Sequence, residues 1–319
     1  MTQLLHTSAE IARAVVTAHG ARFGATDELA VPAVSGGDAV QAGVRAACTA
    51  LGFIAIDADA LARAWQAQTT RTGRFDPDQW PDTPVDFGMG AIPPAERAAA
   101  FPPCPERLGL YAVLPDAAWV GRMARAGVPT VQLRFKSTDA TAVEREVHAA
   151  VDAVRGTPAL LFINDHWQLA IAAGAYGLHL GQEDLDALTP DELQQIRGSG
   201  IRLGVSTHGY AEMLRADEVS PSYIAMGAVY PTTLKRMATA PQGVARLAAY
   251  ARLLRGYPQV GIGGIDEARL PEVLATGVGS VAVVRAIVAS ADPEATAAHW
   301  MKLIDENSAL PPKPTKTAL

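Results

Sequence analysis

From Leu108 onward, short apolar runs alternate with stretches whose apolar residues recur about every 3.6 positions. The apolar runs predict eight strands, at 108–114, 130–135, 160–163, 177–180, 202–206, 223–226, 259–263 and 280–284. The periodic stretches predict helices at 117–126, 140–154, 167–173, 190–197, 210–215, 244–254, 267–275 and 293–304. This alternation is typical of a (β/α)8 TIM barrel, which we expect over residues 108–305. An open, doubly wound sheet is the alternative, but the even spacing and the lack of a Gly-x-Gly-x-x-Gly opening favour the barrel.

The N-terminal part of the chain follows a different pattern. Apolar periodicity predicts helices at 8–19 (with Ser8 as the N-cap), 39–51 and 58–68, and strands at 29–34 and 53–56. Residues 1–70 are therefore expected to form a small α/β or α-rich region of unknown role. The Pro-rich sequence at 71–107 predicts a linker or an arm laid over the main domain. The polar tail at 306–319 is expected to be disordered.

Two aspartates follow neighbouring predicted strands. Asp165 comes directly after the run at 160–163, and Asp184 follows the run at 177–180. The short helical crossover implies parallel neighbouring strands, whose ends lie roughly 5 Å apart, so the two carboxylates can face each other. Mg²⁺ usually binds one or two protein carboxylates, with phosphate oxygens and waters as its other ligands. The pair therefore indicates a magnesium site. The alternative is that Asn164 and Asp165 cap a helix and that Glu183-Asp184 forms a solvated turn.

Polar side chains also end the second predicted strand. Gln132, Arg134 and Lys136 alternate with apolar Leu133 and Phe135, so the three polar residues share one face. In a barrel both faces of a strand are covered, and this face would direct two cations and an amide into the mouth. Arg and Lys together suit a polyanion such as a phosphate ester.

Hydroxyl groups and a Thr/Lys loop follow the next strands. Ser206 ends the fifth strand, although a local turn or helix cap explains it nearly as well. The loop at 231–237, which contains Thr232, Thr233 and Lys235, predicts a mobile anion-binding lid. His179 lies within the fourth strand, where an imidazole of the core is expected.

Glycines and a cation end the last two strands. Gly263-Gly264 follows the seventh strand and Val284-Arg285 the eighth, which is where barrels most often bind a phosphate group. One half of the mouth therefore suggests a metal with a diphosphate, and the other half suggests a monophosphate. Two phosphorylated substrates are implied.

Composition narrows the class of protein. A net charge of −6 without a basic run argues against nucleic-acid binding. Two cysteines, Cys48 and Cys104, are too few for a disulfide framework. No N-terminal leader pattern and no bilayer-length apolar run are present. We expect a soluble cytoplasmic protein that binds neither nucleic acid nor membranes and acts on small molecules, with homo-oligomerisation left open.

Seven short motifs, taken together, resemble the thiamine phosphate synthase family. They are Gln-Leu-Arg-x-Lys at 132–136, Asn-Asp at 164–165, Gly-Leu-His-Leu-Gly-Gln-Glu-Asp at 177–184, Gly-Val-Ser at 204–206, Pro-Thr-Thr-x-Lys at 231–235, Ala-Pro-Gln-Gly at 240–243 and Gly-Ile-Gly-Gly-Ile at 261–265. The resemblance covers residues 108–305 and leaves residues 1–107 unexplained. It implies the coupling of a hydroxymethylpyrimidine diphosphate with a thiazole phosphate, which gives thiamine phosphate and diphosphate with Mg²⁺ as cofactor.

The resemblance also implies roles for individual residues. The pyrimidine diphosphate would contact Gln132, Arg134, Lys136, Asn164, Ser206 and Lys235. Asp165 and Asp184 would hold Mg²⁺, while Gly263 or Gly264 and Val284 would bind the thiazole phosphate. Lys136, Ser206 and Lys235 would serve catalysis. The family often has Pro-Thr-x-Thr-Lys, so Leu234 replaces the second Thr, and whether Thr233 takes its place and whether thiazole-side contacts change are left open. Thr232 and Thr233 are expected to bind substrate. Arg285 replaces a Ser.

The residues and the family agree on mechanism. Neither a nucleophile nor a general base is conspicuous, which is expected if the diphosphate leaves first and the aminopyrimidine stabilises the resulting cation. A barrel similar to the thiazole tautomerase, or a regulatory barrel without coupling activity, is the alternative. Because every motif follows Arg107, we expect the barrel alone to retain activity. Residues 1–107 are left open as a partner-binding or second catalytic module.

Overall fold

The chain forms two compact units, each built from several segments. The computed structural model describes residues 7–26, 30–31, 39–232 and 240–308. One unit, here called the helical unit, comprises residues 1–92 with 209–218 and 252–254. The other, called the barrel unit, comprises residues 93–208, 219–251 and 255–319. The chain thus passes between the two units several times.

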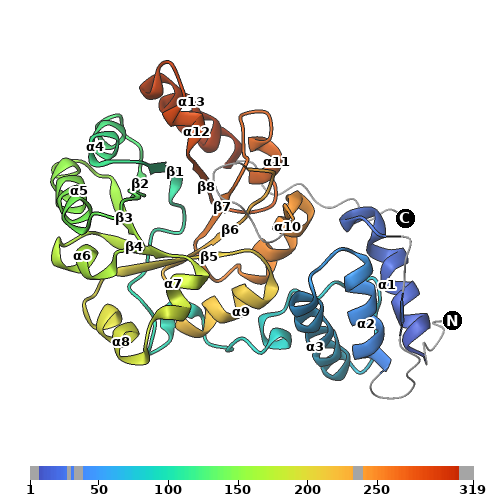
Figure 1. Ribbon diagram of the computed structural model, residues 1–319. Helices are drawn as coiled ribbons and strands as arrows, with labels where there is room; N and C mark the ends of the chain where they lie inside the picture. Colours follow the sequence, from blue (N-terminus) through green and yellow to red (C-terminus); the bar gives the residue numbers. More distant parts are fainter. Residues whose placement is uncertain (1–6, 27–29, 32–38, 233–239, 309–319) are drawn as a thin grey trace. The chain divides into compact units, whose positions relative to one another are not determined.

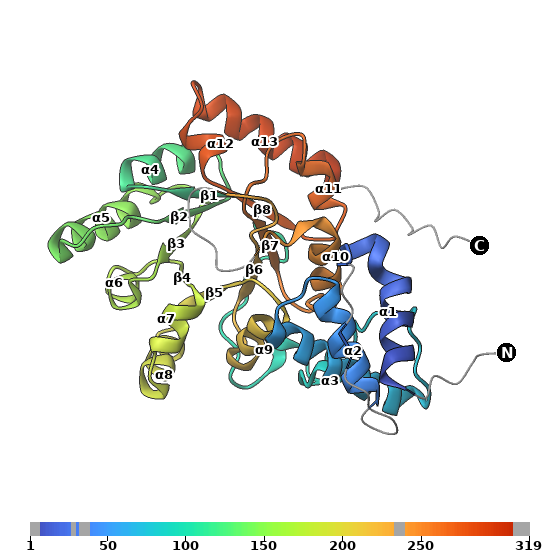
Figure 2. The same cartoon turned by 45° about the vertical axis from the view of Figure 1, so that its right-hand side comes forward.

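The barrel unit contains a closed sheet of eight parallel strands in sequential order, β1 to β8 (Figures 1 and 2). The first and last strands pair in register Gly109↔Ser280, which closes the ring. The strands are β1 Gly109–Leu114, β2 Thr130–Leu133, β3 Leu160–Asn164, β4 Gly177–Leu180, β5 Arg202–Thr207, β6 Tyr223–Met226, β7 Gln259–Ile262 and β8 Ser280–Val283. The predicted (β/α)8 TIM barrel is confirmed, and the open sheet is excluded.

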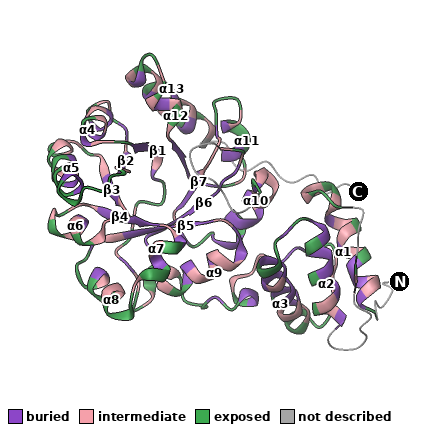
Figure 3. Ribbon diagram, in the orientation of Figure 1, coloured by how far each residue is buried: buried purple, intermediate pink, exposed green. Residues whose placement is uncertain are grey.

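Helices follow the strands along the chain. They are α4 Ala117–Arg125, α5 Ala140–Ala153, α6 Trp167–Ala172, α7 Gln182–Ala187, α8 Pro190–Gly198, α9 Tyr210–Val219, α10 Gly243–Leu253, α11 Leu270–Leu274, α12 Arg285–Val288 and α13 Pro293–Ser308. The strands are buried almost throughout, whereas the helices of the barrel unit expose one side (Figure 3). This burial on both faces explains why the strands are continuous apolar runs. No helix in the described part of the chain has the length and hydrophobicity needed to cross a membrane.

Aromatic side chains fill the barrel interior where neighbouring strands carry glycine. A Cβ added to Gly204 would lie 2.1 Å from the ring of Tyr223, and one added to Gly177 would lie 2.2 Å from the ring of Phe162. Both rings are completely buried. Glycine in a strand interior is normally unfavourable, but here it provides the space that a large ring occupies. The packing fixes Tyr223, which matters for the site.

Residues 93–107 belong to the barrel unit. They include the short 3-10 helix η2 (Pro94–Glu96). Phe101 is 2% exposed, its N–H donates to the carbonyl of Ser220 at 3.0 Å, and the guanidinium of Arg197 lies 5.1 Å from its ring centroid. Arg202 donates to the carbonyl of Pro103 at 3.0 Å. This part of the Pro-rich sequence is therefore packed and hydrogen-bonded.

The helical unit has no strand among its described residues, so the predicted strand at 53–56 is wrong. Its helices are α1 Ser8–Phe23, α2 Ala39–Ala50, α3 Ala55–Thr72 and the 3-10 helix η1 Pro84–Phe87. Helix α3 already begins at Ala55, and Ile54 and Ile56 are 43% and 54% exposed. An apolar run predicts a strand only where a sheet edge can pair with it, and here the helical period of the following residues prevails.

Several other predicted boundaries shift by a few residues. The N-cap of α1 is Thr7, whose side chain accepts a hydrogen bond from the N–H of Glu10, and not Ser8. Strand β2 ends at Leu133, earlier than predicted. Helix α13 continues to Ser308, so the tail does not begin at 306. Most of the predicted strand at 29–34, and residues 309–319, lie outside the described residues.

An aromatic cluster forms the core of the helical unit. Trp65 is completely buried and Trp80 is 6% exposed, and their rings meet edge to face at 5.2 Å. His19 lies 4.9 Å from the Trp80 ring and contacts the carbonyl of Pro77 at 2.9 Å through Nε2, and burial lowers its pKa. Tyr210 at the start of α9 completes the cluster, because its hydroxyl accepts a hydrogen bond from Trp80 Nε1 at 2.9 Å.

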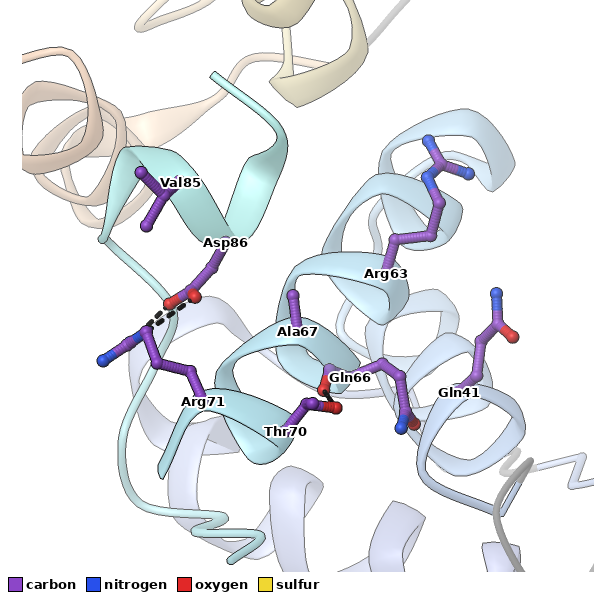
Figure 4. Close-up of a pocket in the computed structure, with 8 residues that line it drawn as sticks. All are labelled: Gln41, Arg63, Gln66, Ala67, Thr70, Arg71, Val85 and Asp86. Atoms are coloured by element: carbon purple, nitrogen blue, oxygen red, sulfur yellow. Dashed lines mark hydrogen bonds and ion pairs between the residues drawn. The ribbon is translucent and has the colours of Figure 1, made fainter. Parts of the chain in front are cut away.

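A bidentate ion pair joins η1 to α3. Arg71 donates to both carboxylate oxygens of Asp86, at 2.8 Å and 2.5 Å (Figure 4). The Asp86 carboxylate raises the pKa of Arg71. Asp86 is 5% exposed, so the pair satisfies a buried carboxylate and fixes the turn that carries Phe87.

Candidate functional site

A cavity of about 1120 Å³ opens at the ends of the barrel strands. The predicted site residues that line it are Gln132, Arg134, Lys136, Asn164, Asp165, Asp184, Ser206, Thr232, Gly263, Gly264, Val284 and Arg285. Thr233 and Lys235 lie outside the described residues. The structure therefore brings together every described residue that the sequence assigned to the site.

The ends of β2 and β3 form one wall of this cavity. Gln132 is 4% exposed and donates from Nε2 to Asn164 Oδ1 at 2.7 Å. Lys136 Nζ lies 2.5 Å from Asp165 Oδ2, in an ion pair in which the lysine side chain is 57% exposed and the aspartate side chain is 21% exposed. The predicted alternation holds, because Gln132, Arg134 and Lys136 line the cavity whereas Phe135 does not.

Asp165 has an unusual backbone conformation. Its φ of 67° lies in the left-handed region, which non-glycine residues rarely adopt. Its N–H donates to the carbonyl of His179 at 3.0 Å, and its own carbonyl accepts from the N–H of Trp167 at 2.9 Å. Asp165 therefore turns the chain sharply from β3 into α6. Such conformations concentrate at functional sites, where the surrounding structure holds them.

Asp184 lies in the first turn of α7 beside Asp165. Its carboxylate accepts a hydrogen bond from the N–H of Gly181 at 3.3 Å. Burial raises the pKa of Asp184, and the negative charge of Asp165 raises it further. The alternative of a solvated turn is therefore wrong, because residues 182–187 are helical and Asp184 is half-buried.

The two carboxylates fit a divalent cation that is shared with a ligand. Like charges held close together repel, and a cation between them would relieve the repulsion that raises the Asp184 pKa. Among the described residues no group of three or more His, Cys, Asp or Glu side chains could hold a metal. A cation here would need oxygens from a substrate or water, which is the usual arrangement for Mg²⁺.

A chain of hydrogen bonds leads from Ser206 into the barrel interior. Ser206 Oγ contacts His179 Nε2 at 2.8 Å, and His179 Nδ1 contacts the hydroxyl of Tyr223 at 2.6 Å. The Tyr223 hydroxyl lies 2.7 Å from that of Tyr111. Burial raises the pKa of both tyrosines far above the physiological range, so both stay neutral. This chain fixes the direction of the Ser206 hydroxyl.

His179 is thus both a core residue and a site residue. It is 7% exposed, as expected for the core, but it also lines the cavity. The sequence contained a usable signal: His179 shares a strand face with Gly177, whose missing side chain leaves room for an interior ring. The link to Ser206 was missed.

The turn after β7 forms the opposite wall. Gly263 and Gly264 have φ values of 103° and 65°. A Cβ on Gly263 would lie 2.6 Å from Ala228 Cβ, and one on Gly264 would lie 2.6 Å from the carbonyl oxygen of Pro231. Both positions therefore require glycine, for conformation and for space.

Arg269 supports this turn and was missed by sequence reasoning. Its guanidinium donates to the carbonyl of Gly264 at 2.8 Å and lies 4.4 Å from the ring centroid of Tyr230. Arg269 and the exposed Arg285 both line the cavity. Two cations thus flank the glycine turn, of which Arg269 also forms an ion pair with Asp266 at 3.4 Å, whereas the carboxylate pair lies across the cavity.

Known proteins match the barrel part of the chain. A family model for thiamine monophosphate synthase matches residues 110–287. Thiamine-phosphate synthase from Neisseria meningitidis serogroup B is 51% identical over 205 residues, which cover 64% of this chain and 98% of that protein. The enzyme from Yersinia pestis (strain Pestoides F) is 48% identical over 205 residues, with 64% and 94% covered. The structure of thiamine phosphate pyrophosphorylase from Pyrococcus furiosus has a TM-score of 0.55 at 25% identity, covering 63% of this chain and 96% of that one.

These matches agree with the motifs and with the barrel geometry. The family model spans more than half of the chain, and the matched relatives are covered almost completely. The N-terminal region lies outside the family match. The chain belongs to the thiamine-phosphate synthase family of transferases.

Proposed function

We propose that this protein couples 4-amino-2-methyl-5-(diphosphooxymethyl)pyrimidine with a thiazole phosphate, or with its carboxylated form. The observation that carries the proposal is the polarity of the cavity. One wall presents Lys136 with the Asp165–Asp184 pair, and the opposite wall presents a glycine turn flanked by Arg269 and Arg285. A diphosphate with a metal suits the first wall and a monophosphate suits the second.

The diphosphate would lie against β2, β3 and β5. Lys136 and Arg134 would supply positive charge, and Asn164, whose Oδ1 accepts a hydrogen bond from Gln132, would direct its amide NH₂ to the pyrimidine. Ser206, oriented by His179, would donate its hydroxyl proton to a diphosphate oxygen. Lys235, which follows β6 in the sequence, would add a third cation to this clamp.

Asp165 and Asp184 would hold Mg²⁺, which would stabilise negative charge on the departing diphosphate. The exposed end of Lys136 would exchange its contact with Asp165 for one with the diphosphate. The lysine and the carboxylates would then each face a partner of opposite charge.

The thiazole phosphate would bind at the turn after β7. Backbone N–H groups of Gly263 and Gly264 can approach an anion closely because neither residue has a side chain. Val284 at the end of β8 would add a backbone N–H, and Thr232 and Thr233 would contact the thiazole from the loop after β6. Arg285 replaces a neutral residue here and would strengthen phosphate binding.

We infer a dissociative reaction. The methylene C–O bond breaks and its electron pair leaves with the diphosphate, while the aminopyrimidine delocalises the positive charge of the methylene. The thiazole nitrogen then donates its lone pair to form the new C–N bond. When the thiazole carries a carboxylate, the C–C bond to it breaks, CO₂ leaves, and the ring carbon keeps the electron pair and takes up a proton from water. The side chains neutralise the leaving-group charge and position the two substrates, which is sufficient for such a reaction.

A single-turnover assay tests the proposal. Protein in excess is mixed with the pyrimidine diphosphate, thiazole phosphate and Mg²⁺, and the formation of thiamine phosphate and diphosphate is followed over time. Equal amounts of the two products support coupling, and no thiamine phosphate with either thiazole contradicts it. Deuterium at the methylene should give a normal secondary isotope effect, since that carbon becomes trigonal. An effect near unity would contradict the dissociative step.

A further inference from the structure

The helical unit contains an unusual helix cap. Helix α9 begins at Tyr210, so its N-cap position is Gly209, which has no side chain to cap the helix. The carboxylate of Asp57, from the first turn of α3, lies there instead. Its Oδ1 accepts the N–H of Ala211 at 2.8 Å, and a Cβ added to Gly209 would lie 2.1 Å from its Oδ2. Asp57 is 4% exposed.

Two further side chains of the same unit hold this turn. Trp80 donates to the Tyr210 hydroxyl at 2.9 Å, and the Phe87 ring stacks on the Tyr210 ring at 5.3 Å with an interplanar angle of 10°. Tyr210 is completely buried. Residues 209–211 are therefore held by a charge-assisted hydrogen bond, a neutral hydrogen bond and an aromatic stack.

The same turn follows the end of β5 directly. Ser206 and His208 line the cavity, and only Thr207 and His208 separate Ser206 from Gly209. Thr207 is fixed in turn, because its hydroxyl donates to the carbonyl of Ala225 at 3.0 Å. His208 precedes Gly209 directly, and Ser206 is three residues away, at most about 11 Å of chain, so the backbone itself links the capped turn to residues that line the cavity.

We propose that residues 1–92 act as a positioning module for the synthase site, and that Asp57 is its positioning residue. The Asp57 carboxylate caps α9 and so fixes the β5–α9 turn that presents Ser206 and His208 to the cavity. The inference rests on the proposed function and extends it to the part of the chain that the family match does not cover. The Neisseria enzyme is covered to 98% by the matched 205 residues, so it leaves almost no length for a counterpart of this module.

The test compares two variants of Asp57 in the full chain. Asp57→Ala removes the acceptor, whereas Asp57→Asn keeps an oxygen that can accept the Ala211 N–H. We expect Asp57→Ala to lower kcat roughly 10- to 100-fold with little change in KM, since small misplacements of site groups have effects of this size. Asp57→Asn should retain most of the activity. All rates are measured well below the melting temperature of each variant.

Two controls separate positioning from general loss of stability or charge. Asp59→Asn removes a negative charge from the same helix, at an exposed residue paired with Arg45. Thr7→Ala removes the cap of α1 and destabilises the same unit away from α9. Both should keep the wild-type kcat. If Thr7→Ala lowers kcat as much as Asp57→Ala does at an equal loss of melting temperature, the positioning role is refuted.

A rescue variant relocates the cap. Asp57→Ala combined with Gly209→Ser places a capping hydroxyl on the N-cap residue itself, in the space that the carboxylate vacates. The φ of Gly209 is not in the left-handed region, so a serine fits its backbone. Recovery of both kcat and melting temperature supports the inference. Recovery of the melting temperature alone would show that Asp57 stabilises α9 without positioning the site.

Amide hydrogen exchange gives a readout that does not depend on activity. Asp57→Ala should accelerate exchange in the peptides that contain residues 206–211, and Asp59→Asn should not. If the wild-type protein fails to couple the two substrates, the proposed function is wrong, but the exchange result still decides whether Asp57 holds this turn. Unchanged exchange at 206–208 in Asp57→Ala overturns the inference.

Discussion

The hydroxyl of Tyr223 joins two hydrogen bonds inside the barrel, and Tyr223→Phe tests its role. This hydroxyl bridges His179 Nδ1 at 2.6 Å and the Tyr111 hydroxyl at 2.7 Å, in a completely buried setting. Phenylalanine keeps the ring that fills the space over Gly204. The substitution therefore removes two hydrogen bonds and leaves the packing intact.

The magnitude follows from the number of buried groups that lose a bond. In Tyr223→Phe both His179 and Tyr111 lose a bond, and at about 1–3 kcal/mol for each buried group the free energy of unfolding should fall by about 2–6 kcal/mol. In Tyr111→Phe, Tyr223 keeps its bond to His179, so the loss should be about 0.5–1.5 kcal/mol. Turnover should fall in Tyr223→Phe, because His179 no longer holds Ser206 in one direction.

Urea denaturation of the two variants, with Tyr250→Phe as a control, measures these differences. Tyr250 is also buried and donates to Gln242 Oε1 at 2.9 Å, but it does not belong to the chain of bonds that reaches Ser206. Its variant should lose stability without losing turnover. Equal losses of stability in Tyr223→Phe and Tyr111→Phe would refute the reasoning, because the chain would then not pass through Tyr223. Wild-type turnover in Tyr223→Phe would show that this series of hydrogen bonds does not contribute to catalysis.

Three further predictions concern the site and its surroundings. Asp165→Asn and Asp184→Asn should each raise the Mg²⁺ concentration needed for half-maximal turnover, and unchanged Mg²⁺ titrations in both variants would remove the metal assignment. Because burial and the charge of Asp165 raise the pKa of Asp184, the Mg²⁺ affinity of the wild-type protein should weaken as the pH falls toward that raised pKa. Lys136→Ala should weaken pyrimidine diphosphate binding and lower turnover together, measured by calorimetry and single-turnover rates, while stability changes by less than about 1 kcal/mol because the ion pair is partly exposed. Cys104 should resist Ellman's reagent in the folded protein, since burial raises the pKa of its thiol to about 12 and leaves roughly one thiolate in 10⁴ at pH 8. Rapid labelling of Cys104 before denaturation would contradict this prediction.

The sequence predicted the barrel and the walls of its cavity because both follow from local patterns. Parallel strands that are buried on both faces are apolar runs, and their polar ends mark one edge of the sheet. Gln132, Asp165 and Gly263 were found in this way. The same reasoning failed at residues 53–56, because an apolar run of this length is equally compatible with the start of a helix, and only the tertiary structure distinguishes the two.

Contacts across the barrel could not be predicted from local sequence patterns. Tyr111 is on β1 and Tyr223 on β6, and these strands are not neighbours in the sheet, so their hydrogen bond depends on how the ring closes. Arg269 was predicted within a helix at 267–275, but the helix begins at Leu270 and Arg269 is free to turn back to Gly264. In both cases the partner is set by tertiary geometry and not by spacing along the chain.

The Asp57 cap bears on whether the barrel part of the chain is sufficient for full activity. All recognisable motifs follow Arg107, which by itself suggests that the barrel is sufficient. However, residues 209–218 lie between β5 and β6 in sequence and yet belong to the same compact unit as residues 1–92. A barrel cut at Arg107 would lose Asp57, Trp80 and Phe87, which cap, hydrogen-bond and stack on the first residues of α9. The uncapped helix would begin three residues after Thr207, and two residues after His208, which lines the cavity. A truncated chain can therefore retain every motif and still position Ser206 less well than the full chain.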